Sequence, residues 1–380
     1  MKDVVPNAGQ NTILKGKILL YRVFDIGEEI DLEKAEKILV ENPTSRSKFR
    51  LKKMNQQAVI VSNDPLSIGL GPYSFTTENR EFTADLSAKL WDFGTISLTF
   101  EFLIPEETTF DELRRLSSII QDYDELDTYA RARAREFTAQ IKNAMGKIND
   151  WEVYEDYTLY FIEKLSQTSD DLSSLLNQEE IASLILIEER GTLSQQIIQR
   201  IYDSKLQYYK NDLALIDWNS AFIIEPSGSL DIPDVIEFAL NQLLEMRYYD
   251  DLLDKKLREI YSAIELKDVS IFNTRYNELV LEAGQKYIEI AEIVESVENS
   301  LKVIGDLYHS VIFRTASTKF RFTDWQSSID NKLDNLADIC KLLLDNINHK
   351  RSYVLELIII ALISIELIPF IEHVQKFFEK

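Results

Sequence analysis

The residue patterns that mark metal and nucleotide sites are scarce in this chain. A single cysteine among 380 residues excludes an internal disulfide and a cysteine-based metal cluster. The three histidines, His309, His349 and His373, are scattered and lack the spacing of a zinc site. Gly69-Leu70-Gly71-Pro72 lacks the glycine pattern that holds a phosphate. The sequence therefore predicts a protein that is not an enzyme, with no catalytic residues, no cofactor and no metal.

Basic residues are also too few to balance the acids. The chain has 42 lysines and arginines against 64 acids, which gives a formal net charge of −22. A surface of that sign repels phosphate backbones, so the charge argues against direct nucleic-acid binding. Arg131, Arg133 and Arg135 do not change this, because alternate positions on a helix spread around its circumference rather than forming one basic face.

A long apolar stretch is missing from the N-terminus. Lys15, Lys17 and Arg22 interrupt residues 1–23, so no segment there resembles a signal peptide. We therefore expect the bulk of the chain to lie in the cytoplasm.

Residues 1–230 predict an α+β head domain. Alternating or continuous apolar runs predict strands at residues 17–26, 58–61, 95–103, 157–162 and 221–224. Asp31 precedes the apolar face of a short helix, and Thr109 with Glu112 resembles a capping box that opens another helix. The Pro65–Pro72 segment, with its two glycines, is interpreted as a loop.

Residues 231–350 predict an antiparallel bundle of three coiled-coil helices. Apolar residues recur at spacings of three and four from Ile236 to Ile264, from Val280 to Val311 and from Ile329 to Ile347. The third helix could instead form a long parallel coil between chains. Cys340 falls on that third stripe and is interpreted as a small core residue. Asp250 is an acidic residue on the first stripe, which we interpret as pairing with Arg247 or setting the register of the helices.

Residues 351–380 predict a C-terminal transmembrane helix with a short tail. About thirteen large apolar side chains between Val354 and Ile371 favour insertion by roughly 6 kcal/mol, which outweighs two acids away from the centre. The run of about 18 residues is roughly 27 Å long, close to the hydrocarbon thickness of about 30 Å. The alternative is a helix buried in the core of an oligomer.

The two acids in that run, Glu356 and Glu366, are the candidate site residues of the predicted membrane helix. A carboxylate in hydrocarbon is costly, so it is expected to pair between helices or to stay protonated and fix an oligomer. The alternative for Glu366 is a position close enough to the interface to reach water.

The C-terminal segments Asn348–Glu366 and Gln242–Asp250 resemble the "required for meiotic nuclear division" family, whose core is a domain of unknown function. The resemblance covers roughly the last 170 residues and is loose before them. It implies membrane anchoring through the tail and self-association, and for mitochondrial members support of translation at the inner membrane. It supplies no catalytic residues; only Glu356 and Glu366 match family positions. The absence of a mitochondrial leader favours a bacterial-type member.

These observations together predict a non-enzymatic, tail-anchored scaffold or tether at the bacterial inner membrane. It would contact the bilayer through residues 353–371 and form homo-oligomers through its helical stalk. The alternatives are a subunit of an ion channel or transporter with a cytoplasmic α+β head, and a soluble enzyme of unknown chemistry.

Overall fold

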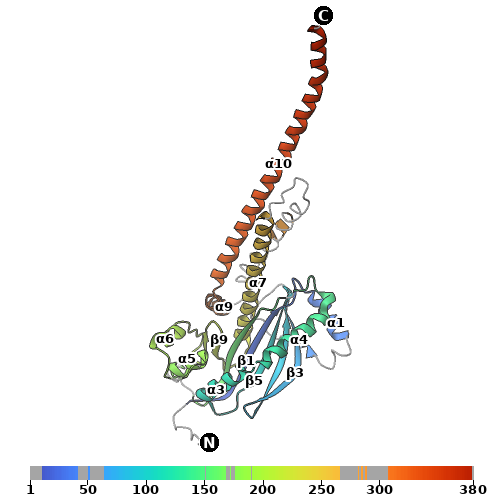
Figure 1. The fold of residues 1–380 in the computed structure, drawn as a ribbon. Coiled ribbons are helices and arrows are strands. Elements are labelled where there is room, and N and C mark those ends of the chain that lie inside the picture. The colour runs from blue at the N-terminus through green and yellow to red at the C-terminus, as the bar shows by residue number, and fades with distance from the viewer. Residues whose placement is uncertain are drawn as a thin grey trace. The chain divides into compact units, whose positions relative to one another are not determined.

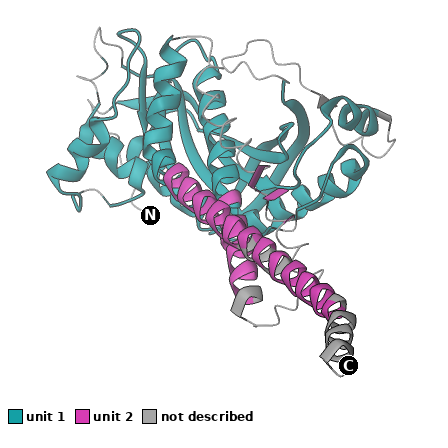
Figure 2. Cartoon of the chain, turned by 90° about the horizontal axis from the view of Figure 1, so that it is seen from above, with its two compact units in different colours: residues 1–248, 297–324 teal, residues 249–296, 325–380 magenta. Residues whose placement is uncertain are grey.

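The structure is a computed structural model that describes residues 11–41, 50–51, 64–149, 151–167, 172, 176–189, 191–265, 281, 284–285, 287–288 and 307–378. The chain divides into two compact units, shown in two colours in Figure 2. Unit 1 comprises Met1–Tyr248 and Val297–Asp324, and unit 2 comprises Tyr249–Ser296 and Trp325–Lys380.

Unit 1 is a mixed domain built on one large sheet (Figure 1). Its strands are β1 (Thr12–Asp25), β2 (Arg50–Leu51), β3 (Leu66–Thr77), β4 (Arg80–Leu90), β5 (Thr95–Leu103), β6 (Thr108–Thr109), β7 (Tyr154–Leu165), β8 (Leu213–Ile216) and β9 (Ser220–Ile224). The order across the sheet is β2-β3-β4-β5-β1-β7-β9-β8, and β6 pairs with the beginning of β1. Among these pairs β7 and β9 run parallel, and the others are antiparallel.

The described helices of the chain are α1 (Leu32–Glu41), α3 (Phe110–Gln121), α4 (Glu125–Ile141), α5 (Gln178–Leu186), α6 (Gln195–Tyr202), α7 (Asp231–Glu265), α9 (Leu307–Lys319) and α10 (Phe322–Phe378). A short 3-10 helix, Lys142–Ala144, follows α4. The predicted capping box is confirmed: the Thr109 side chain accepts from the Glu112 backbone, and the Glu112 carboxylate accepts from the Thr109 backbone. These bonds satisfy amide groups at the start of α3 that would otherwise lack partners.

The central strand β1 is buried on both faces, which explains its continuous apolar sequence. Ile18 and Leu20 belong to the core shared with α1, α3, α4, α5 and α6, whereas the alternate residues Leu19, Tyr21 and Val23 are buried on the opposite face. Successive side chains of a strand point to opposite faces, so a strand covered on both sides loses the apolar–polar alternation of a half-exposed one. The first half of α7 lies against this second face, where Ser97, the partner of Val23 in β5, donates to Glu237.

The predicted transmembrane helix is not supported by the structure. Within the described part of the chain, no helix carries an apolar stretch that is long enough to cross a membrane. The apolar residues lie in α10, where Glu356 and Glu366 leave nine residues between them. At 1.5 Å per residue those nine span about 14 Å, roughly half of a hydrocarbon core. The predictions of a membrane anchor and of a location at the bacterial inner membrane are corrected with it, whereas contact of residues 353–371 with a bilayer stays a prediction.

The predicted loop at Pro65–Pro72 is also wrong, because β3 runs through it. Residues Leu66–Gly69 pair with β4, and the register shifts by one residue between Gly69 and Gly71. Gly71 has a φ of +83°, which accommodates this bulge without strain. The glycines and prolines therefore mark an irregularity inside a strand rather than the end of one.

In unit 2, the second half of α7 and the body of α10 carry buried apolar residues and a polar cluster. Leu253 and Leu257 of α7 and Leu333 and Leu336 of α10 are buried. The second predicted helix of the bundle, from about residue 276, lies mainly outside the described residues; α9 is its described end and belongs to unit 1.

Candidate functional site

A buried layer of polar side chains lies between the sheet and the first half of α7 in unit 1. Asp234, Glu237 and Asn241 are three and four residues apart, so they share one face of α7. Lys89 Nζ of β4 lies 2.7 Å from Asp234 Oδ1 and 2.6 Å from Glu237 Oε2. One lysine of the sheet thus pairs with two carboxylates of the helix.

Strand β5 supplies hydroxyl donors to the same helix face. Ser97 Oγ donates to Glu237 Oε1, and Thr95 Oγ1 donates to Asn241 Oδ1 at 2.5 Å. Asn241 Nδ2 in turn donates to the carbonyl oxygen of Glu237 at 2.7 Å. Both Glu237 and Asn241 are buried, so these bonds replace the water that the side chains lose on folding.

The carboxyl groups of this layer stabilise the charged form of Lys89. Burial alone would lower the pKa of Lys89, but the carboxylates of Glu237 and Asp234 outweigh it and raise that pKa above its usual value. Burial raises the pKa of Glu237, and the charge of Lys89 opposes the rise. The cluster therefore depends on all of its members, since a buried charge without its partner is costly.

A second buried cluster lies where β1 ends and β7 begins. Asp25 Oδ1 accepts from Asn149 Nδ2 at 2.9 Å and from the Gly27 amide at 3.1 Å. Asn149 Oδ1 accepts from the Tyr248 hydroxyl of α7 at 3.1 Å. Glu155 of β7 accepts a hydrogen bond from Nη1 of Arg247. Arg247 follows Gln242 and Glu245 in the sequence of α7.

Two carboxyl groups of this second cluster titrate near neutral pH. Burial raises the pKa of Asp25 to about 7, against the lowering effect of the bonds from Asn149 and Gly27. Burial likewise raises the pKa of Glu155 to about 7, against the lowering effect of Arg247. Perturbed carboxyls are typical of catalytic sites, but a general acid must reach its substrate. Asp25 is 4% exposed and Glu155 8%, so this cluster is suited to joining strands to α7 rather than to proton transfer with a ligand.

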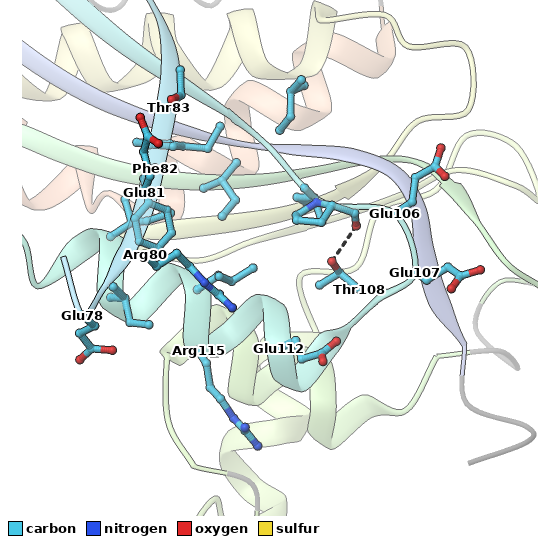
Figure 3. Close-up of a pocket in the computed structure, with 18 residues that line it drawn as sticks. Glu78, Arg80, Glu81, Phe82, Thr83, Glu106, Glu107, Thr108, Glu112 and Arg115 are labelled. Carbon is cyan, nitrogen blue, oxygen red and sulfur yellow. Dashed lines mark hydrogen bonds between the residues drawn. The ribbon is translucent and has the colours of Figure 1, made fainter. Parts of the chain in front are cut away.

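An open groove of about 910 Å³ lies on the other side of unit 1 (Figure 3). It is bounded by β4, by the end of β5 with the loop that follows, and by α3. Its floor is apolar and contains Ile18, Phe82, Phe102, Ile104, Leu116, Ile119 and Ile120. A groove of this size and character is at the upper end of the range of ligand pockets.

The rim of the groove carries more acids than bases. Its exposed charged residues are Glu78, Arg80, Glu81, Glu106, Glu107, Glu112 and Arg115. Figure 3 shows Glu78 and Arg80 on one side of the groove and Glu106 and Glu107 on the other. Leu103, which is 78% exposed, adds an apolar side chain to this rim. The groove can therefore receive a molecule that is apolar on one face and cationic on another.

The structure gives partners to two of the candidate residues that the sequence singled out. Arg247 bonds Glu155 in unit 1, whereas Asp250 lies in unit 2, where it accepts from Ser328 Oγ at 2.7 Å and pairs with Lys332 Nζ at 2.8 Å. Glu356 is exposed on α10. The side chain of Glu366 lies outside the described residues.

Sequence reasoning did not find the partly buried Lys89 or the buried carboxyl groups of Glu237, Asp25 and Glu155. Three of them stand in strands beside apolar neighbours, and such interruptions are also typical of an exposed strand face. The spacing of Asp234, Glu237 and Asn241 was the available signal, because it places three polar groups on one side of a helix.

The comparison with protein families decides the relationship of unit 1. The family described as "Uncharacterized protein MJ0711, N-terminal domain" matches residues 15–231, more than half of the chain. The chain belongs to this family. Its match covers the strands of the sheet and ends at the first residue of α7. The comparisons do not show membership of the "required for meiotic nuclear division" family. What they show is that the chain belongs to a different family, which is also uncharacterized.

Two curated proteins are similar to the chain. The uncharacterized protein MJ0711 of Methanocaldococcus jannaschii is 24% identical over 223 residues, which cover 58% of this chain and 67% of that protein. Human nesprin-2 is 24% identical over 209 residues, which cover 51% of this chain but 3% of nesprin-2. No solved structure matches the chain. The relatives therefore carry no activity over to it.

Proposed function

We propose that this chain is a non-enzymatic scaffold that assembles into homo-oligomers through α10. The observation that carries the proposal is an exposed apolar segment of that helix. Eight large aliphatic side chains in it are between 50% and 65% exposed: Leu355, Leu357, Ile358, Ile359, Ile360, Leu362, Ile363 and Ile365. We call residues 355–365 the apolar collar.

The apolar collar surrounds the helix rather than forming a stripe. Consecutive residues of a helix are about 100° apart, so Leu357–Ile360 already place an apolar side chain in every direction. A helix that is hydrophobic all round is stable where other elements bury it, and exposed apolar patches of this extent mark interaction sites. A bundle of more than two copies buries more of the circumference of each helix than a dimer does.

The energy of such a bundle is sufficient for stable assembly. Fully burying an exposed leucine or isoleucine side chain contributes about 1.5–3 kcal/mol, and the collar side chains are 50% to 65% exposed, so four of them from each of two copies contribute roughly 6–12 kcal/mol. Association costs about 4–15 kcal/mol in lost freedom of motion. Gain and cost are similar for one pair, so a bundle of more copies, which buries more side chains of each, is the favoured assembly; the net charge of −22 on each copy opposes it at low salt.

The other two functions predicted from the sequence have weaker support. A channel or transporter subunit required a membrane-crossing helix, and the described residues offer none. An enzyme would be expected to use the near-neutral carboxyls Asp25 and Glu155, which are buried away from any substrate.

The test is the mass of the full-length chain in detergent-free buffer, measured by light scattering after size exclusion at roughly 1–100 µM. We expect a defined oligomer of more than two copies. The variant Ile359→Lys/Ile363→Lys places two charges on one face of the apolar collar and should shift the mass to that of a monomer. Because apolar burial drives assembly and salt screens the repulsion, the oligomer should persist or strengthen at about 0.5 M salt.

The matched control is Asn348→Lys/Ser352→Lys, which adds the same charges at the same spacing on an exposed polar part of α10. It should leave the mass unchanged. A monomeric unaltered chain at the highest concentration, or equal masses for the two double variants, would refute the proposal.

A further inference from the structure

We infer that the groove between α3, β4 and β5 binds a cationic amphipathic peptide segment of a partner protein. The groove belongs to unit 1 and the apolar collar to unit 2, and the two share no residue, so this inference does not depend on the proposed assembly. Its occupant must place apolar side chains against the floor and positive side chains against the rim.

The apolar floor determines one face of the occupant. Phe82 of β4, Phe102 of β5 and Ile120 of α3 each line the groove while remaining below 9% exposed. They form its base, and Leu116 and Ile119 are partly exposed beside them. An amphipathic helix laid in such a groove anchors through residues at i, i+3, i+4 and i+7.

The charges of the rim determine the other face. Five glutamates and two arginines surround the opening, which gives a net charge of −3 from the lining residues. Complementary charge increases the rate of encounter and rejects wrong partners. Lysine or arginine side chains beside an apolar anchor therefore fit this rim, whereas an acidic or purely apolar segment does not.

The backbone at the two sides of the groove supports a binding role for its acids. Glu78 and Glu107 have φ values of +48° and +62°, in the left-handed region that favours glycine and asparagine. Glu78 and Asn79 form the two-residue turn between β3 and β4, where Asn-Gly is the preferred sequence. Strained residues cluster at functional sites, and here both strained glutamates carry a charge to the groove.

The experiment compares two triple variants of the full-length chain that lose the same number of charges. The groove variant is Glu78→Asn/Glu106→Gln/Glu107→Asn. The control variant is Glu33→Gln/Glu36→Gln/Glu189→Gln, at exposed positions away from the groove. Because asparagine tolerates a positive φ better than glutamate, the groove variant should melt at the same temperature as the unaltered chain or higher.

The probe is a fluorescent peptide of about 14 residues with leucine on one helical face and lysine on the other. Its binding is measured by anisotropy at roughly 0.15 M salt. We expect the groove variant to bind about tenfold more weakly and the control variant to stay within about twofold of the unaltered chain. Leu103→Ser should also weaken binding, while Tyr261→Ser, at another exposed apolar residue, should not.

Three results would overturn the inference. The first is the absence of peptide binding to the unaltered chain. The second is equal weakening in the two triple variants, which would show attraction by the acidic surface as a whole. The third is binding of spermidine that is tighter than that of the peptide, which would make the groove a site for small polycations.

Discussion

Replacing Lys89 by methionine tests the buried polar layer between the sheet and α7. Methionine keeps the length and apolar stem of lysine but removes the ammonium group that lies 2.7 Å from Asp234 and 2.6 Å from Glu237. Glu237 is 1% exposed, so its carboxylate cannot regain water without opening the interface. The substitution therefore leaves a buried negative charge beside a second one.

The expected cost follows from that uncompensated charge. Removing one partner of a buried ion pair destabilises a protein by about 3–5 kcal/mol. A domain is typically stable by about 5–15 kcal/mol, so the loss is a large fraction of the total. The double variant Lys89→Met/Glu237→Met removes both charges and should recover much of this loss, because well-packed apolar replacements of an ion pair are often neutral.

The loss should depend on pH in a defined direction. The pKa of Glu237 is already raised by burial, and Lys89 opposes this rise more strongly than Ser97 does, so the substitution raises the pKa further. A carboxyl group whose pKa is higher in the folded state binds a proton that the unfolded state releases. Stability is then greatest below the unfolded pKa of 4.5 and decreases as pH rises through the folded pKa. The deficit of Lys89→Met should therefore grow above pH 4.5.

The assay is urea denaturation followed by far-ultraviolet circular dichroism at several pH values between about 5 and 8. Lys34→Met, at an exposed position on α1, is the control and should change stability by less than about 0.5 kcal/mol. A Lys89→Met deficit below about 1 kcal/mol at neutral pH, or a deficit that does not vary with pH, would refute the reasoning.

Three further predictions concern other parts of the structure. Because the pKa of the Asp25 carboxyl is raised to about 7, the folded chain loses stability between about pH 4 and 7 as this group deprotonates. Asp25→Asn should remove that loss, which is measured by comparing the pH dependence of unfolding in the two chains. Asp250 and Lys332 should show a coupling energy of about 0.5–2 kcal/mol in a double-mutant cycle with alanine, and additive effects would contradict the contact. Thr109→Ala should cost about 1 kcal/mol, because it removes the cap of α3, whereas Thr109→Ser should cost less in the same denaturation assay.

The sequence predicted correctly those helices and strands whose pattern of apolar and polar residues matches the buried and exposed sides they have in the structure. The predicted strand at residues 95–103 is β5 without a change of boundary, because its apolar residues alternate and face one core. The capping box at Thr109 and Glu112 is a contact across three residues and can be recognised without tertiary information. The cap of α5 is a similar local contact, in which the Asn177 side chain accepts from the Glu179 and Glu180 amides.

The features that the sequence analysis missed or predicted wrongly depend on more of the chain than a short stretch of sequence contains. The hydropathy of Val354–Ile371 as a whole favoured a membrane span, but no helix in the described part of the chain is both long and apolar enough to cross a membrane. Lys89 and Glu237 are 148 residues apart, so their pairing cannot be read from periodicity. The groove likewise combines a hairpin, a loop and a helix that are separate in the sequence.

The polar layer shows why two correct local patterns can give a wrong picture when they are combined. On β5, Thr95 and Ser97 alternate with apolar residues, which is typical of a strand with one face in water. On α7, Glu237 and Asn241 lie beside an apolar stripe, which is typical of a helix with one face in water. In the structure these two polar faces meet each other and are buried. Their hydrogen-bonding groups therefore determine where α7 docks on the sheet, a specificity that apolar packing alone supplies less sharply.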